Sequence, residues 1–321
     1  MQDRFNRSFL QALLAHWNLE LMHVRPDDRI DGSPERTLSR VVIADVRERM
    51  FVLEEIAPAE SGRKQQIALI LEYLSRQGLQ KVHPWLEDRQ GKIVTEYGGR
   101  CWQLRPYIPG SSLPRSEYLG EAWRGIALAD FLIDLRIAAS NAGHSFAGAP
   151  FSVVDFIHTL IDKLAAYHPE ILSRIKPALG YLADEFFGVH DNLPLAFCHG
   201  DYHPLNVIWS EAAILSVIDW EFCGVKTEAY DLALLLGCLG MEDPLMLNGP
   251  LIRSLLQRII ERNLYDERSL KCLPELVMAL RFAWLSEWLR KNDMEMVCLE
   301  LDYLSLLFHN QSAIKSAWRC F

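Results

Sequence analysis

The sequence predicts an α+β chain with two lobes, a small mixed β-sheet lobe at the N-terminus and a mainly helical lobe at the C-terminus. Segments rich in Val, Ile and Phe, which are typical of strands, concentrate in residues 1–105. Residues 106–114 contain three prolines, one glycine and two serines, which indicates a connector and a candidate hinge. From residue 115 to residue 321 apolar residues recur at helical spacing nearly throughout.

In the first lobe, one long helix is expected among two strand pairs. The predicted elements are a helix over 7–17, strands over 38–44 and 50–56, a helix over 61–78, and strands over 92–97 and 101–108. Each strand pair is expected to form a hairpin, the second one about Gly98 and Gly99. The helices predicted for the second lobe span 121–140, 153–167, 171–187, 251–263, 273–291 and 294–310.

The composition argues against several classes of protein. The formal net charge of −9 disfavours a nucleic-acid partner, because that binding needs clustered Lys and Arg. The longest apolar stretches, such as residues 127–135, are interrupted by charged residues well before the ~20 residues that a membrane span needs. The seven cysteines include no CxxC pair, so neither a disulfide framework nor a structural zinc site is supported. Because no leader-like segment is seen at the start, we expect a cytoplasmic protein with no membrane partner. Its oligomeric state is left open.

The chemistry is concentrated in residues 197–221, where two short apolar strands flank polar turns. If residues 207–209 pair with 215–218 as a hairpin, Asn206 and Asp219 emerge side by side at its open end. An amide oxygen and a carboxylate at one point suit Mg²⁺. Asp201 precedes Asn206 by five residues, which is the D-x-x-x-x-N spacing of a phosphoryl-transfer loop, and is placed to accept a proton from an attacking hydroxyl.

Three segments in this order resemble the aminoglycoside phosphotransferase family and its relatives among choline and homoserine kinases. They are His199-Gly200-Asp201 with Asn206, residues 218–221, and residues 230–233. The resemblance implies a protein-kinase-like bilobal fold and the transfer of phosphate from ATP, with Mg²⁺, to a hydroxyl of a small molecule such as an amino alcohol, a sugar or an aminoglycoside-like compound. It also implies that Asp201 is the catalytic base, that Asn206 and Asp219 hold Mg²⁺, and that Asp231 braces the catalytic loop.

Other polar residues of these segments admit more than one role. We expect His199 to be structural, holding the loop through its ring nitrogens. His203 could be structural or functional. Glu221 could position the loop or touch a second ion, and the structural role is favoured.

The nucleotide side is expected to use residues from the first lobe and the hinge. Gly32 and Ser33 lie just before the first strong strand, where the family places its phosphate-covering loop, although a plain surface turn fits equally well. The resemblance also assigns the adenine contacts to the carbonyl of Pro106 and the N–H of Ile108, which the neighbouring prolines do not obstruct. Val52 lies on the adjacent strand and is expected to face the nucleotide.

Glu54 departs from the family pattern. Kinases of this shape place a lysine here to grip the α- and β-phosphates, paired with a glutamate on the next helix, and a carboxylate would repel them. We hypothesise a swapped ion pair in which Glu54 orients Lys64 or Arg63 at the start of that helix, and that cation reaches the phosphates from the helix side. Alternatively, the register is misplaced by one or two residues. Two other functions stay open: a nucleotide-binding pseudokinase, and a transferase of adenylate.

The acceptor is expected between the catalytic loop and the last helices. The candidate residues there are Glu275, Arg281, Trp284, Glu287, Glu300 and Asp302. Acidic groups in that region would suit an alcohol that carries an amine. Arg281, Trp284 and Trp288 recur at helical spacing, so this face is either core or pocket lining.

Overall fold

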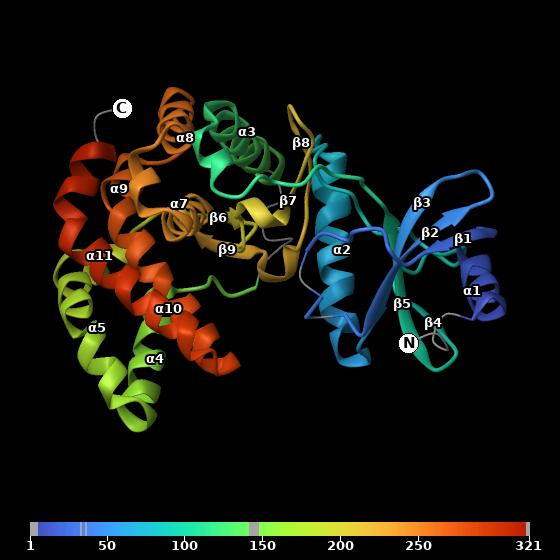
Figure 1. Ribbon diagram of the computed structural model, residues 1–321, viewed down its shortest axis with the longest axis horizontal. Coiled ribbons are helices and arrows are strands. Elements are labelled where there is room, and N and C mark those ends of the chain that lie inside the picture. The colour runs from blue at the N-terminus through green and yellow to red at the C-terminus, as the bar shows by residue number, and fades with distance from the viewer. Residues whose placement is uncertain (1–5, 33, 36, 141–147, 319–321) are drawn as a thin grey trace. The chain divides into compact units, whose positions relative to one another are not determined.

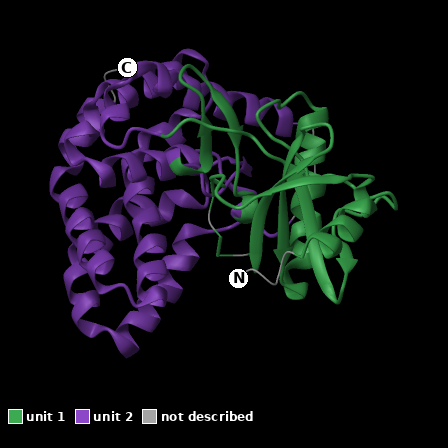
Figure 2. Ribbon diagram, turned by 45° about the vertical axis from the view of Figure 1, so that its right-hand side comes forward, with its two compact units in different colours: residues 1–112, 205–221 green, residues 113–204, 222–321 purple. Residues whose placement is uncertain are grey.

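The computed structural model describes residues 6–32, 34–35, 37–140 and 148–318, and it divides the chain into two compact units (Figure 2). Unit 1 comprises Met1–Ser112 and Leu205–Glu221, and unit 2 comprises Leu113–Pro204 and Phe222–Phe321. The first crossing lies inside the connector proposed for residues 106–114. The return of Leu205–Glu221 to unit 1 differs from the division expected from the sequence, which left these residues in the second lobe.

Unit 1 is built on a five-stranded antiparallel sheet with strand order β1-β2-β3-β5-β4 (Figure 1). Its strands are β1 Leu21–Arg25, β2 Ser39–Asp45, β3 Met50–Ile56, β4 Thr95–Tyr97 and β5 Arg100–Pro106, and its helices are α1 Arg7–Leu14 and α2 Ser61–Arg76. Both predicted hairpins are present, and all pairs are antiparallel, so the sheet is not mixed. Strand β1 was not predicted, because its five residues include the polar His23 and Arg25 at half-exposed or exposed positions.

One face of this sheet packs against α1. Leu10, Leu13 and Leu14 of the helix form a buried cluster with Leu53 of β3 and Trp102 of β5. Successive residues of a strand point to opposite faces. The opposite face therefore carries the residues that alternate with this cluster: Arg40, Val42, Val52, Glu54, Gln103 and Arg105.

The two-stranded hairpin of β7 Val207–Trp209 and β8 Ile214–Val217 also belongs to unit 1. Val217 N–H donates to Lys81 O at 2.8 Å, and Ser111 N–H donates to Trp209 O at 2.7 Å. Each strand of the hairpin is thus joined by a backbone hydrogen bond to a segment that flanks the main sheet. This explains why the hairpin folds with unit 1 despite its position late in the chain.

Unit 2 is mainly helical, with one short strand pair. Its helices are α3 Ala122–Ala139, α4 Val153–Tyr167, α5 Pro169–Leu182, α6 Gly188–His190, α7 Tyr230–Glu242, α8 Pro250–Glu261, α9 Glu267–Lys271, α10 Leu273–Lys291 and α11 Met294–Trp318, with a π-helical turn at Ala183–Phe187. The strands are β6 Leu195–Cys198 and β9 Gly224–Thr227, which pair antiparallel. Helix α7 is almost entirely buried, and α10 packs against α7, α4 and α11. Among the residues that the structure describes, no helix is both long and apolar enough to cross a membrane.

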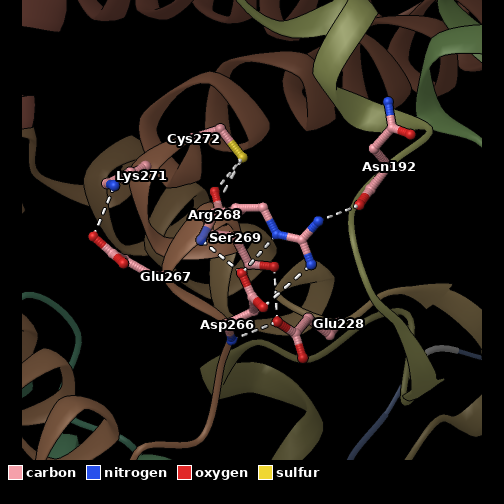
Figure 3. Close-up of polar contacts among 8 residues, drawn as sticks. All are labelled: Asn192, Glu228, Asp266, Glu267, Arg268, Ser269, Lys271 and Cys272. Carbon is pink, nitrogen blue, oxygen red and sulfur yellow. Dashed lines mark hydrogen bonds and ion pairs between the residues drawn. The ribbon is translucent and has the colours of Figure 1, made fainter.

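The junction between β9 and α7 is fixed by the buried carboxylate of Glu228 (Figure 3). It accepts hydrogen bonds from Asp266 N–H and from the Ser269 hydroxyl, both at 2.7 Å. Arg136 of α3 completes the set with an ion pair at 3.0 Å. Because Glu228 lies three residues before Asp231, this network fixes the start of α7, the helix that carries Asp231.

Candidate active site

The hairpin of unit 1 brings Asn206 and Asp219 to its open end. Val207 pairs with Val217, and Ile218 N–H donates to Asn206 O at 2.9 Å, so the pairing continues one step beyond the strands. Asp219 follows directly. The hairpin that the sequence predicted is therefore formed, and the two candidate metal ligands stand next to each other.

Asp219 adopts a left-handed backbone conformation, with φ of 66°. Residues other than glycine rarely adopt this conformation, although Asp and Asn do so more easily than most. Strained backbone of this kind concentrates at functional sites, where the surrounding structure holds it in place. Here the β8 pairing on one side and the turn Trp220–Phe222 on the other, in which Trp220 and Glu221 are buried, enforce it.

The donor set of this corner fits a magnesium ion. It offers one amide oxygen and one carboxylate, both hard oxygen ligands. Among the described residues there is no group of three or more His, Cys, Asp or Glu side chains that could enclose a metal. A site with two protein ligands suits Mg²⁺, which keeps several waters and substrate phosphates in its octahedral shell.

In unit 2, the loop that carries Asp201 is held by Asp231 of α7. The carboxylate of Asp231 accepts His199 N–H at 2.7 Å and Gly200 N–H at 2.8 Å. Burial raises the pKa of Asp231 to about 6, although these two hydrogen bonds act in the opposite direction. His199 is fully buried, and its Nδ1 accepts Asp201 N–H at 3.2 Å. The arrangement fixes the loop backbone from His199 to Asp201.

Gly200 is required by a close approach of the chain. Its φ is +86°, and a Cβ at this position would lie 2.1 Å from Phe222 O. Any side chain would therefore strain the backbone and push the loop away from the residues that follow Glu221. This close approach explains why the His-Gly-Asp motif has a glycine at its central position.

The side chain of Asp201 lies beside His203, with Oδ1 and Nε2 3.6 Å apart. The His203 ring makes an edge contact with Trp284 of α10, at 6.2 Å between centroids, and Trp284 stacks on Trp288 at 5.8 Å. Tyr202, between the two polar residues, is fully buried and donates to Leu128 O of α3 at 3.2 Å. The loop thus presents Asp201 and His203 while Tyr202 anchors it in the core.

Comparison with known proteins agrees with this geometry. The profile of the phosphotransferase enzyme family matches residues 35–270, which include Asp201, Asn206 and Asp219. The chain belongs to this family. It is 27% identical over 263 residues to a homoserine kinase of Xanthobacter autotrophicus, and the match covers 77% of each chain.

Solved structures show the same fold. A microcompartment-associated aminopropanol kinase superimposes with a TM-score of 0.69 at 15% identity, over 97% of this chain and 99% of the other. The amicoumacin kinase hAmiN, in complex with AMP-PNP, Ca²⁺ and Ami, gives 0.64 at 14% identity, over 96% and 95%. The predicted bilobal kinase-like fold and the predicted class, a small-molecule kinase, are confirmed.

Against this family background, Glu54 has a different partner from the one we hypothesised. Its Oε1 lies 3.5 Å from Arg105 Nη2, and its Oε2 accepts a long hydrogen bond of 3.5 Å from Trp85 Nε1. Glu54 is buried within β3, opposite Arg40 and Gln103, and does not lie at an exposed strand end. The swapped pair with Lys64 or Arg63 is wrong, because strand β5 presents Arg105 closer to the carboxylate than the helix presents either cation.

Lys64 is instead bound to Glu221, in a contact that sequence reasoning missed. Both side chains are buried, and the Lys64 ammonium forms an ion pair with the Glu221 carboxylate. Arg63 Nη2 also donates to Glu221 O at 2.7 Å. The start of α2 is therefore tied to the turn that follows Asp219. Because the two residues lie 157 positions apart, no local pattern predicts this pair. The one indication in the sequence is the acid two residues after Asp219, Glu221 itself.

The remaining nucleotide candidates lie in unit 1, in two groups. Gly32 has φ of +91°, and a Cβ there would lie 3.1 Å from Ile218 Cδ1. This loop therefore runs close to the hairpin end that carries Asn206 and Asp219, which we call the metal corner. Ser33 lies outside the described residues. Val52 is on the sheet face turned away from α1, Pro106 ends β5, and Ile108 follows it without regular structure.

The acidic residues proposed for the acceptor side all have cationic partners within unit 2. Glu300 forms a buried bidentate pair with Arg281, with both contacts at 2.6 Å. The other three pairs are Glu275 with Lys315 at 2.5 Å, Glu287 with Arg290 at 2.6 Å, and Asp302 with Arg174 at 2.8 Å. None of these carboxylates therefore adds an uncompensated charge, and Trp284 is the candidate that lies against the catalytic loop.

Proposed function

We propose that this protein transfers the γ-phosphoryl group of ATP, with Mg²⁺, to a hydroxyl of a small molecule. The observation that carries the proposal is the hairpin that brings Asn206 and Asp219 to its open end, together with Asp201 on a braced loop five residues before Asn206. Family membership and the kinase-like fold support the same reaction. The nucleotide analogue and divalent ion named with hAmiN support ATP and a metal as cofactors.

In this proposal each residue has a defined task. Asp201 orients the acceptor hydroxyl and takes its proton, and the hydrogen bonds to its loop backbone keep the carboxylate in position. Asn206 and Asp219 would hold Mg²⁺, which supplies neutralisation of the phosphate charge when bound. Such transfer needs little covalent help from the protein, so positioning and charge neutralisation account for most of the catalysis.

An amino alcohol is our first choice of acceptor, ahead of sugars and aminoglycoside-like compounds. Homoserine and aminopropanol, the compounds in the names of the relatives, each carry an amine and a hydroxyl. We place this acceptor beside Trp284 and His203, the ring pair next to Asp201. The paired acids of α10 and α11 give no separate support for a highly cationic acceptor.

The pseudokinase alternative rested on Glu54. Its carboxylate is compensated by Arg105, so the objection that it repels the phosphates loses its force. The cytoplasmic location and the absence of nucleic-acid or membrane partners stay predictions.

The proposal is tested by calorimetry of ATP binding with and without Mg²⁺, followed by an ADP-release assay over a panel of amino alcohols, sugars and aminoglycosides. We expect Mg²⁺ to strengthen binding in the wild type and in D184A, which removes an exposed carboxylate of unit 2. D219A should lose the metal dependence. Absence of ATP binding, or equal metal dependence in D219A, would reject the proposed site.

A further inference from the structure

Four polar side chains occupy neighbouring positions on the sheet face turned away from α1. Arg40 of β2 is directly opposite Glu54 of β3, and Glu54 is directly opposite Gln103 of β5. Arg105 follows Gln103 on the same face, two residues along the strand, and its Nη2 lies 3.5 Å from Glu54 Oε1. The group contains two cations and one anion, so arginines outnumber carboxylates among these four side chains.

Arg40 connects this charged face to the metal corner within unit 1. Its guanidinium interacts electrostatically with Glu54 and Arg105, and also with Asp219 and Asp31. Its Nη2 donates to Ile30 O at 3.1 Å, just before the loop that contains Gly32. A guanidinium has five N–H donors in a planar fork, so it can keep this bond and still bind phosphate oxygens.

Gln103 provides an independent indication that a ligand binds here. Its side chain is fully buried, and neither its amide oxygen nor its amide nitrogen has a hydrogen-bond partner among the described residues. Leaving a buried amide unpaired costs about 1–3 kcal/mol, so such groups in proteins usually meet a ligand or an ordered water. Gln103 lies beside Glu54 and two residues before Arg105 on the same face, so the unpaired amide belongs to this polar group, with Arg40 on the far side of Glu54.

We propose that Arg40, together with Arg105, provides the phosphate grip that a lysine on β3 provides in related kinases. Glu54 then positions the side chains of the two arginines through its negative charge. The ligand is the polyphosphate of a purine nucleotide, and the inference rests on the proposed function. It explains how an acid at position 54 is compatible with phosphate binding, because the charges of Arg40 and Arg105 offset that of the Glu54 carboxylate.

The proposal distinguishes two outcomes for a lysine placed at position 54. If the site had merely decayed, E54K would restore the family residue and strengthen ATP binding. With Arg40 and Arg105 as the grip, E54K instead places three cations side by side, and like charges at this distance repel. We therefore expect E54K to bind ATP no better than the wild type and to be less stable.

The decisive experiment is calorimetry of ATP, ADP and adenosine with the wild type, R40A, R40K and R100A in the presence of Mg²⁺. Arg100 is the matched control, because it lies on the α1 face of the sheet, 3.7 Å from Glu55 and over the Phe9 ring. Loss of one charge-assisted contact is expected to weaken ATP and ADP binding by about 10- to 100-fold in R40A. Adenosine should bind R40A as it binds the wild type, R40K should be intermediate, and R100A should be unchanged.

Each outcome bears on a different claim. If R40A binds ATP and ADP like the wild type, the inference is overturned while the proposed function stands. An equal loss of affinity for adenosine would show that R40A damages the whole nucleotide site, and this result would also overturn the inference. If the wild type binds no nucleotide, the proposed function fails and this inference fails with it. Circular dichroism of R40A and R100A establishes that both variants are folded.

Discussion

The buried carboxylate of Asp231 gives the catalytic loop a pH dependence. Burial raises its pKa to about 6, against the effect of the hydrogen bonds from Gly200 N–H and His199 N–H. A carboxyl group whose pKa rises on folding binds its proton more tightly in the folded state. Its stabilising contribution is complete below the unfolded pKa of about 4 and is lost as the pH rises through about 6.

We therefore expect the difference in unfolding free energy between the wild type and D231N to shrink by about 3 kcal/mol between about pH 4 and pH 7, since each pKa unit corresponds to about 1.4 kcal/mol. Urea unfolding at several pH values measures this difference. A difference that stays constant over the range would show that Asp231 titrates at its ordinary value.

Gly200 offers a second prediction at the scale of one residue. A Cβ at Gly200 would lie 2.1 Å from Phe222 O, and the φ of +86° disfavours any side chain, so G200A should lose at least about 2 kcal/mol of stability and nearly all activity. Gly180 is the matched control, because it is exposed within α5 and has no heavy atom within 4 Å of a Cβ built there. G180A should gain about 0.5–1 kcal/mol. Thermal unfolding of both variants decides between local strain and a general intolerance of alanine.

At the scale of elements, the Lys64–Glu221 pair joins helix α2 to the turn after Asp219. Removing one partner leaves an uncompensated buried charge, so K64A and E221A should each cost about 3–5 kcal/mol. The double variant K64M/E221L should cost much less than the sum, because it buries apolar groups in place of two charges. The exposed pair of Arg76 with Glu72 is the control, and R76A should cost less than about 1 kcal/mol. Additive costs in a double-mutant cycle would show that the buried pair is not coupled.

Local patterns predicted most elements of this fold, because hydrophobic periodicity is a local signal. The helices over 153–167 and 273–291 were predicted with the bounds that the structure has. We did not predict the pairing of β6 with β9. Each strand has only four residues, and paired residues such as Cys198 and Gly224 are distant in sequence, so no local pattern indicates the pair. In the site, the motif spacing located Asn206 and Asp219 correctly at one hairpin end. The partners of Glu54 and Lys64 could not be predicted, because they depend on strand register and on contacts distant in sequence.

At the scale of the whole molecule, the chain crosses between its two units three times, so the first unit cannot be obtained by one cut. A fragment of residues 1–112 leaves Lys81 O and Ser111 N–H without their hairpin partners in β8 and β7. It also exposes Gly110, where a Cβ would lie 2.5 Å from Ile208, at a point of close packing against the missing hairpin. We expect this fragment to unfold without a cooperative transition.

Adding residues 205–221 to that fragment through a flexible linker should restore cooperative folding. Ser111 N lies 2.7 Å from Trp209 O, and the five residues from 205 to 209 span at most about 14 Å, so a Gly/Ser linker of about eight residues is long enough to join residue 112 to residue 205. If the added segment raises the free energy of unfolding by a few kcal/mol, the midpoint of thermal unfolding should rise by at least about 10 °C over that of the shorter fragment. Circular dichroism during heating measures it, with a scrambled 205–221 sequence on the same linker as the control. Equal transitions for the native and scrambled segments would mean that the hairpin does not fold with the five-stranded sheet, and that the metal corner is built by unit 2 instead.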